Sequence, residues 1–114
     1  MANERRYQRF PLAGSANLRY KVQGENKTIH AMISDISLDG IGLYLDISLE
    51  TATDVSIDIT FIVTDGTIKT DSIEGSIGYA REISGMYFTG IEFSEEVNPS
   101  KQPFLYEHIS NISS

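Results

Sequence analysis

The chain has 114 residues, the size of one domain that can bury a hydrophobic core of its own. It contains no cysteine, which excludes disulfides and thiolate metal sites and suits a reducing cytoplasm. A net charge of −7 argues against a general DNA- or RNA-binding protein, because such proteins neutralise phosphates with a basic surface. Since no apolar run is long enough to span a bilayer and no signal peptide is recognisable, we expect a cytoplasmic protein without direct membrane insertion.

The first segment, residues 1–12, differs from the rest in charge and in pattern. Residues 1–21 have a net charge of +4, whereas residues 22–114 have a net charge of −11. A compact anion should therefore be attracted to the N-terminal end. Residues 1–12 show no strand periodicity, and Pro11 restricts the backbone at their end. We predict a flexible arm over residues 1–12, followed by a folded domain over residues 13–114.

Apolar and polar residues alternate over most of residues 15–94, as in strands with one buried face. Turn sequences containing glycine divide this region into six predicted strands, at 15–22, 28–34, 40–46, 54–64, 67–82 and 86–93. In the fifth strand the alternation changes between Ile68 and Ile73, and Gly75 and Gly78 interrupt it, so we expect a bulge or bend there. Amphipathic strands favour an antiparallel sheet, and a long bent strand among short ones favours a closed barrel.

After Asn98 the pattern changes to a helical one. Leu105, Ile109 and Ile112 recur at helical spacing, and Asn98 or Ser100 could cap the first turn. We therefore predict one C-terminal helix at about 98–112. The predicted fold class is all-β with this one helix, a six-stranded antiparallel β-barrel.

Two short motifs about thirty residues apart carry the chemistry. Arg5, Arg6 and Arg9 form an R-x-x-x-R cluster, and residues 35–40 read D-x-S-x-x-G. A guanidinium can donate two parallel hydrogen bonds to O6 and N7 of guanine, while the N1 and N2 hydrogens of guanine need acceptors such as a carboxylate or a hydroxyl. The arginines could provide the first set of contacts, and the second motif could provide the acceptors.

Within the second motif each named residue has an expected role. Asp35 and Ser37 lie two residues apart in extended chain, so both side chains should point to the same face. Gly40 could adopt a positive φ in a turn, or could allow close approach of the backbone where a Cβ would obstruct it.

In this order and spacing the two motifs resemble those of the PilZ domain, a bacterial receptor for cyclic di-GMP. The resemblance covers almost the whole chain and implies a six-stranded barrel with a terminal helix and no catalytic activity. It places Arg5 and Arg9 on the guanine and phosphate groups of the ligand, with Arg6 inside the same motif. Asp35, Ser37 and Gly40 would surround a guanine edge. Whether one ligand or a stacked pair binds stays open.

The resemblance also implies a mechanism without chemistry. We expect the arm to become ordered when cyclic di-GMP bridges it to the Asp35–Gly40 turn, and a downstream protein partner to recognise the changed surface. Arg81, at the end of the bent strand, either joins the ligand site or solvates an edge. Tyr44 and Tyr79 are interpreted as aromatic residues of the core or of the barrel surface.

Other functions have weaker support from the residues. Asp35, Ser37, Asp39, Gly40 and Asp46 match positions 1, 3, 5, 6 and 12 of a calcium-binding loop, but that loop lies between two helices and here the flanks alternate as strands. His30, Ser34 and Asp35 have the residue types of a hydrolytic triad, without a nucleophile elbow. We therefore expect no catalytic residues and no bound metal.

Two binding alternatives keep a barrel fold. An oligonucleotide-binding barrel needs a basic groove lined with aromatic residues, and here only the arm is basic. The stronger alternative is a PilZ-fold protein-interaction module that does not bind nucleotide. The presence of both motifs argues against this second alternative.

Overall fold

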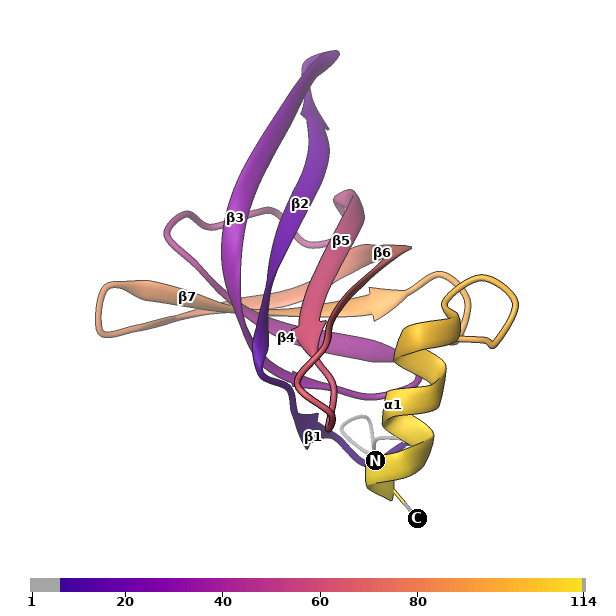
Figure 1. Cartoon of the computed structure of the whole chain (residues 1–114). Helices are drawn as coiled ribbons and strands as arrows, with labels where there is room; N and C mark the ends of the chain where they lie inside the picture. The colour runs from indigo at the N-terminus through magenta and orange to yellow at the C-terminus, as the bar shows by residue number, and fades with distance from the viewer. Residues whose placement is uncertain (1–6, 114) are drawn as a thin grey trace.

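The computed structural model describes residues 7–113, which fold into a barrel with one helix beside it (Figure 1). The elements are β1 (Phe10–Pro11), β2 (Gly14–Val22), β3 (Glu25–Ile36), β4 (Gly40–Leu45), β5 (Asp54–Ile62), β6 (Ile68–Ile83), β7 (Met86–Phe93) and α1 (Pro103–Ser113). The sheet order is β1-β3-β2-β5-β6-β7-β4, and an additional β3–β4 pairing closes strands β2 to β7 into a barrel. All neighbouring strands are antiparallel, which confirms the predicted fold class.

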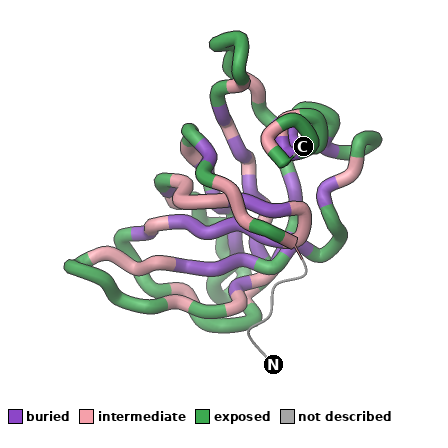
Figure 2. Tube along the Cα trace, turned by 90° about the horizontal axis from the view of Figure 1, so that it is seen from below, coloured by how far each residue is buried: buried purple, intermediate pink, exposed green. Residues whose placement is uncertain are grey.

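The core fills the inside of the barrel with the inward residues of each strand (Figure 2). Strand β5 shows the predicted alternation best, because Val55, Ile57, Ile59 and Phe61 are buried while the residues between them are not. At roughly 1.5–3 kcal/mol for each large apolar side chain removed from water, this inward set is the main contribution to folding. The face that points outward is left free for other contacts.

The long strand β6 bends where it was predicted to do so. Its pairing with β7 shifts register between Ile77 and Tyr79, which leaves Gly78 as the extra residue of a bulge. The expected change of alternation between Ile68 and Ile73 was wrong, because Ile68 is 65% exposed and Asp71 occupies an inward position at 8% exposure. Because the polar Asp71 occupies an inward position, the regular alternation of this part of β6 could not be recognised from the sequence.

The buried Asp71 explains where the helix begins. Its Oδ2 accepts a hydrogen bond from the backbone N–H of Leu105 at 2.8 Å, so a strand side chain satisfies a free donor in the first turn of α1. Asn98 instead holds the preceding turn, since its Oδ1 accepts from the N–H groups of Ser100 and Lys101 at 3.0 and 2.8 Å. The helix therefore begins at Pro103 and not at 98 as predicted.

The N-terminal segment contributes a short strand that the sequence pattern did not indicate. In β1, Phe10 and Pro11 pair with Ile36 and Asp35 of β3, and Leu12 is buried beside them. A strand of two residues is too short for any alternation to reveal it. Arg5 and Arg6 lie outside the described residues, and the flexibility predicted for the arm stays a prediction.

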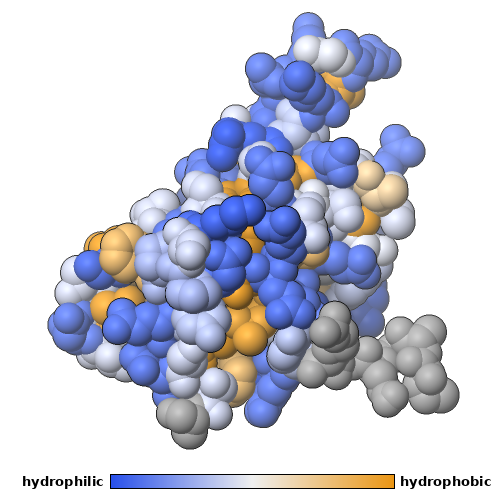
Figure 3. All heavy atoms as spheres, turned by 90° about the vertical axis from the view of Figure 1, so that its right-hand side faces the viewer, coloured by the Kyte–Doolittle hydropathy of each residue, from blue (hydrophilic) through white to orange (hydrophobic). Residues whose placement is uncertain are grey.

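The outer surface is largely hydrophilic on the side where α1 lies (Figure 3). The β2–β3 hairpin projects from the barrel at the top of this view and is covered mainly by hydrophilic side chains. Among residues 7–113, no helix is both long and apolar enough to cross a membrane.

Candidate functional site

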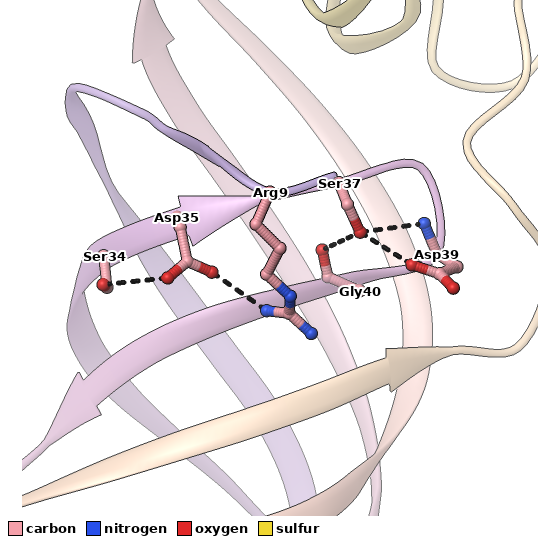
Figure 4. Close-up of polar contacts among 6 residues, drawn as sticks. All are labelled: Arg9, Ser34, Asp35, Ser37, Asp39 and Gly40. Carbon is pink, nitrogen blue, oxygen red and sulfur yellow. Dashed lines mark hydrogen bonds and ion pairs between the residues drawn. The ribbon is translucent and has the colours of Figure 1, made fainter. Parts of the chain in front are cut away.

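Arg9 of the first motif meets the second motif on the outside of the barrel, at the end of β3 (Figure 4). Because β1 pairs Pro11 with Asp35, the chain places Arg9 beside the same carboxylate. Nη1 of Arg9 lies 2.9 Å from Oδ1 of Asp35, and the two side chains are 15% and 25% exposed. The other oxygen of Asp35, Oδ2, accepts a hydrogen bond from Ser34 Oγ at 3.1 Å. Residues separated by about a quarter of the chain thus form one polar cluster.

This arrangement differs from the one expected, in which Arg9 and Asp35 contact a guanine from two sides. Here they contact each other, through one hydrogen bond between the side chains. A guanidinium has five N–H donors, and the buried Nε of Arg9 has no hydrogen-bond partner. Arg9 is therefore held in place with part of its donor capacity unused.

Gly40 is needed for the position of Arg9. Its φ is not in the left-handed region, which in the described chain holds the glycines at 24, 66 and 85. A Cβ at Gly40 would lie 3.1 Å from Nη2 of Arg9 and 2.7 Å from the carbonyl oxygen of Ile91. Of the two roles considered for this glycine, close approach applies and the positive φ does not.

Ser37 lies in the turn itself and is fully buried. Its hydroxyl donates to Oδ1 of Asp39 at 2.7 Å and accepts from the N–H of Asp39 at 3.3 Å, while its own N–H donates to the carbonyl oxygen of Gly40 at 2.9 Å. Ser37 was expected on the same face as Asp35 because side chains alternate along a strand. This expectation was wrong, because β3 ends at Ile36 and Ser37 lies beyond the strand. The hydroxyl holds the turn and does not stand free beside the carboxylate.

A row of aromatic side chains continues outward from this cluster. Gly42 pairs with Asp35, and a Cβ at Gly42 would lie 3.0 Å from Oδ1 of Asp35 and 2.9 Å from Cζ of Phe88. The Phe88 ring in turn lies 5.3 Å from the ring of Tyr44 and 6.1 Å from that of Tyr79, measured between centroids. The sequence pattern indicated both tyrosines only as core or surface aromatics, and it did not indicate Phe88.

Arg81 lies at the far side of the same row. Its Cζ is 6.0 Å from the centroid of the Phe88 ring, close enough for a cation–π contact. The strand register that brings these side chains together joins β4 to β7 and β7 to β6. Glycines at two outward positions of a strand pair, Gly42 and Gly90, are the one signal in the sequence that could have indicated an open surface here.

Two clefts open elsewhere, around the end of β2, the start of β5 and the middle of β6, with volumes of about 480 and 930 Å³. Arg19, Ser56, Glu74 and Ser94 line both of them. Neither Arg9 nor any residue of 35–40 lines either cleft. Their charged groups are of both signs, and Arg19 is already paired with Asp58, so these clefts offer no concentrated attraction for an anion.

The alternative chemistries considered for residues 30–46 do not fit the geometry. The flanks of the calcium-like pattern are strands β3 and β4, whereas a calcium loop of that type needs helices. Within residues 7–113 no cluster of three or more metal-ligating side chains is found. Nδ1 of His30 lies 3.0 Å from Oδ1 of Asn17, and Ser34 bonds Asp35, so these residues do not form a triad.

Comparison with known proteins relates this arrangement to one family. The sequence model of the PilZ domain matches residues 3–107, a stretch that includes both motifs. The comparison with curated protein sequences found no match.

Several solved structures share the fold. The inhibitor of motility MotI/DgrA of Bacillus subtilis superposes with a TM-score of 0.74 and 16% identity, over 97% of this chain and 52% of that one. The MrkH–c-di-GMP complex of K. pneumonia gives a TM-score of 0.60 and 18% identity, over 97% of this chain and 51% of that one. The PilZ domain of YcgR from Escherichia coli with c-di-GMP gives a TM-score of 0.56 and 17% identity, over 96% of this chain and 88% of that one. The chain thus spans about half the length of the first two proteins.

Proposed function

Because this chain belongs to the PilZ domain family, we propose that it is a receptor for cyclic di-GMP and binds this ligand at Arg9 and Asp35 on the outer face of the barrel. The observation that carries the proposal is the contact of Arg9 with Asp35 at 2.9 Å, next to the pairing of β1 with β3. Two of the proteins with a similar fold were solved with c-di-GMP, which supports this choice of ligand.

The residues suit a guanine nucleotide in a specific way. The Asp35 carboxylate can accept hydrogen bonds from N1 and N2 of a guanine, while the Nη hydrogens of Arg9 that do not bond Asp35 can be donated to an oxygen of the base or of a phosphate. Since Arg9 and Asp35 already contact each other, little reorganisation is required before the ligand binds. Gly40 leaves room for the guanidinium, and Ser37 acts as a positioning residue that holds the turn.

Arg5 and Arg6 complete the proposed site from outside the described residues. We assign them to the phosphates and to the exposed faces of the bases, because a guanidinium can pair with a phosphate and stack on a purine. The net charge of +4 over residues 1–21 attracts the doubly anionic ligand to this end, whereas the remaining −11 repels it elsewhere.

The proposed output is a change of surface and not a reaction. Binding would order the arm against the barrel, and a downstream protein partner in the cytoplasm would recognise the combined surface of arm and ligand. No residue is assigned a catalytic role, and DNA, RNA and metal ions are not proposed as ligands. The rival function is a PilZ-fold protein-interaction module without a nucleotide.

Isothermal titration calorimetry separates these two functions. Charge-assisted hydrogen bonds of roughly 1.5–3 kcal/mol each must exceed the cost of ordering the arm, so we expect an affinity near micromolar, about −8 kcal/mol. GMP, single-stranded DNA and calcium serve as controls. Saturable binding of cyclic di-GMP with little response to the three controls supports the receptor, and absence of any response to cyclic di-GMP supports the interaction module.

A further inference from the structure

Three neighbouring strands place a row of rings on the outer face, which we call the aromatic row: Tyr44, Phe88 and Tyr79. Tyr44 pairs with Phe88 across β4 and β7, and Arg81 pairs with Phe88 across β6 and β7, so Phe88 lies at the centre. The rings of Tyr44 and Phe88 meet edge to face at 61°, and those of Tyr79 and Phe88 are tilted by 42°. Such packing fixes the orientation of the rings before any ligand arrives.

Two glycines leave the strand surface beside the aromatic row without side chains. Gly42 and Gly90 are directly opposite each other, and Tyr79 pairs with Gly90 on the other side. A Cβ at Gly90 would lie within 2.3 Å of the Tyr79 ring, so this ring rests on the strand where any other residue would push it away. The absence of two side chains thus lets the aromatic rings lie close to the strands.

The aromatic row begins next to the carboxylate of the proposed site. Oδ1 of Asp35 and Cζ of Phe88 both lie within 3.0 Å of the position that a Cβ of Gly42 would occupy, which puts these two atoms no more than about 6 Å apart. From β4 across β7 to β6 the row covers two strand spacings, roughly 10 Å. This span exceeds the reach of a single base held at Asp35.

The far end of the row remains accessible and cationic. Tyr79 is 41% exposed and Arg81 is exposed. Among residues 7–113, Arg81 takes part in no ion pair, and its one described interaction is with the Phe88 ring. A guanidinium placed against a ring, with its donors unused, is suited to a base or a phosphate that lies over that ring.

We propose that the aromatic row and Arg81 form a second subsite, which holds the other purine of a cyclic dinucleotide whose first guanine contacts Asp35 and Arg9. The assignment rests on the proposed function and extends it to the whole ligand. The second base stacks on the exposed ring of Tyr79, beside Phe88, and Arg81 donates to that base or to the adjoining phosphate. The row therefore selects two-base ligands over mononucleotides.

The test compares two ligands on variants at the far end of the row. Because stacking contributes about 1–3 kcal/mol per base, Arg81→Ala and Tyr79→Ala should each weaken cyclic di-GMP binding by about five- to hundredfold in calorimetry. GMP, followed by NMR shift titration, should bind these variants as it binds the wild type, since a single guanine uses Asp35. Tyr79→Phe keeps the ring and should bind cyclic di-GMP within about threefold of the wild type.

The chain contains no tryptophan, so Tyr79→Trp introduces a single fluorescent reporter. Cyclic di-GMP should quench its emission on stacking, and GMP should not. Unchanged cyclic di-GMP affinity in Arg81→Ala and Tyr79→Ala, or equal losses for both ligands, would overturn the second subsite while leaving the receptor in place. A wild-type protein that does not bind cyclic di-GMP would overturn the receptor and the subsite together.

Discussion

Among residues 7–113, two arginine–aspartate pairs lie on the outer face of the barrel, both with 2.9 Å between nitrogen and oxygen, in contrasting surroundings. Arg19 binds Asp58 through two hydrogen bonds, at 2.9 and 3.3 Å, and Ser72 donates a third to the same carboxylate at 2.6 Å. Arg9 makes one hydrogen bond with Asp35, and its Nε has no partner. The Arg19 side chain is 51% exposed, whereas that of Arg9 is 15% exposed.

An ion pair alone therefore does not indicate a binding site. An exposed pair is typically worth less than 1 kcal/mol, and the pair of Arg19 and Asp58 has the geometry of a saturated surface contact. What distinguishes the pair of Arg9 and Asp35 is its setting, with unused donors on one side and glycines and aromatic rings on the other.

The largest effect is expected from removing either member of the proposed site. Arg9→Ala and Asp35→Ala should each weaken cyclic di-GMP binding by about 2–4 kcal/mol, because the polar groups of the ligand lose their partners. Calorimetry measures the loss, and circular dichroism checks that the barrel is intact. Arg19→Ala and Asp58→Ala are the matched controls and should bind like the wild type. Wild-type affinity in both Arg9→Ala and Asp35→Ala would show that the two pairs are equivalent and would remove the site.

A somewhat smaller effect is expected at the glycine beside Arg9. The Cβ of Gly40→Ala would lie 2.7 Å from a backbone oxygen of β7, which cannot move without disturbing the strand. We expect the free energy of unfolding to fall by about 1–3 kcal/mol, measured by urea denaturation, and ligand affinity to fall with it.

Gly78→Ala is the control for this substitution, because its Cβ would meet only the Glu92 side chain and the Gly90 carbonyl, at 3.3–3.4 Å. It should cost less than about 1 kcal/mol. Equal destabilisation by the two alanines would mean that the crowding at Gly40 is not special to the site.

The smallest effect is expected for the ion pair of Arg19 and Asp58, on the free energy of unfolding. The hydrogen bond from Ser72, followed by that from Arg19, lowers the pKa of Asp58 below its ordinary value of 3.8. A carboxyl group with a lowered pKa stabilises the fold above that ordinary value, and the contribution is lost as pH falls through the lower pKa of the folded state. Because the pair is largely solvated, Asp58→Asn should cost less than about 1 kcal/mol at neutral pH. Urea denaturation should show this difference disappearing below pH 3.8, and a difference that persists in acid would contradict the assignment.

Much of the fold could be predicted from local patterns. Alternation in β5 and the glycine at the bulge of β6 depend on residues close together in sequence, and both indicated the right structure. The same locality explains two errors. The inward position of Asp71 depends on its hydrogen bond to Leu105, far along the chain. The start of the helix depends on whether Asn98 caps the helix or the turn before it, and residue spacing does not distinguish the two.

The six strands, the C-terminal helix and the two motifs can be predicted from local sequence, because side-chain periodicity and turn chemistry act over a few residues. The contact of Arg9 with Asp35, the burial of Ser37 in the turn and the close approach at Gly40 are properties of the folded chain. The aromatic row is another such property, since Tyr44, Phe88 and Tyr79 come from three strands whose register no local pattern contains. Closing a barrel pairs residues that are far apart along the chain, and those pairings follow from the packing of the whole core.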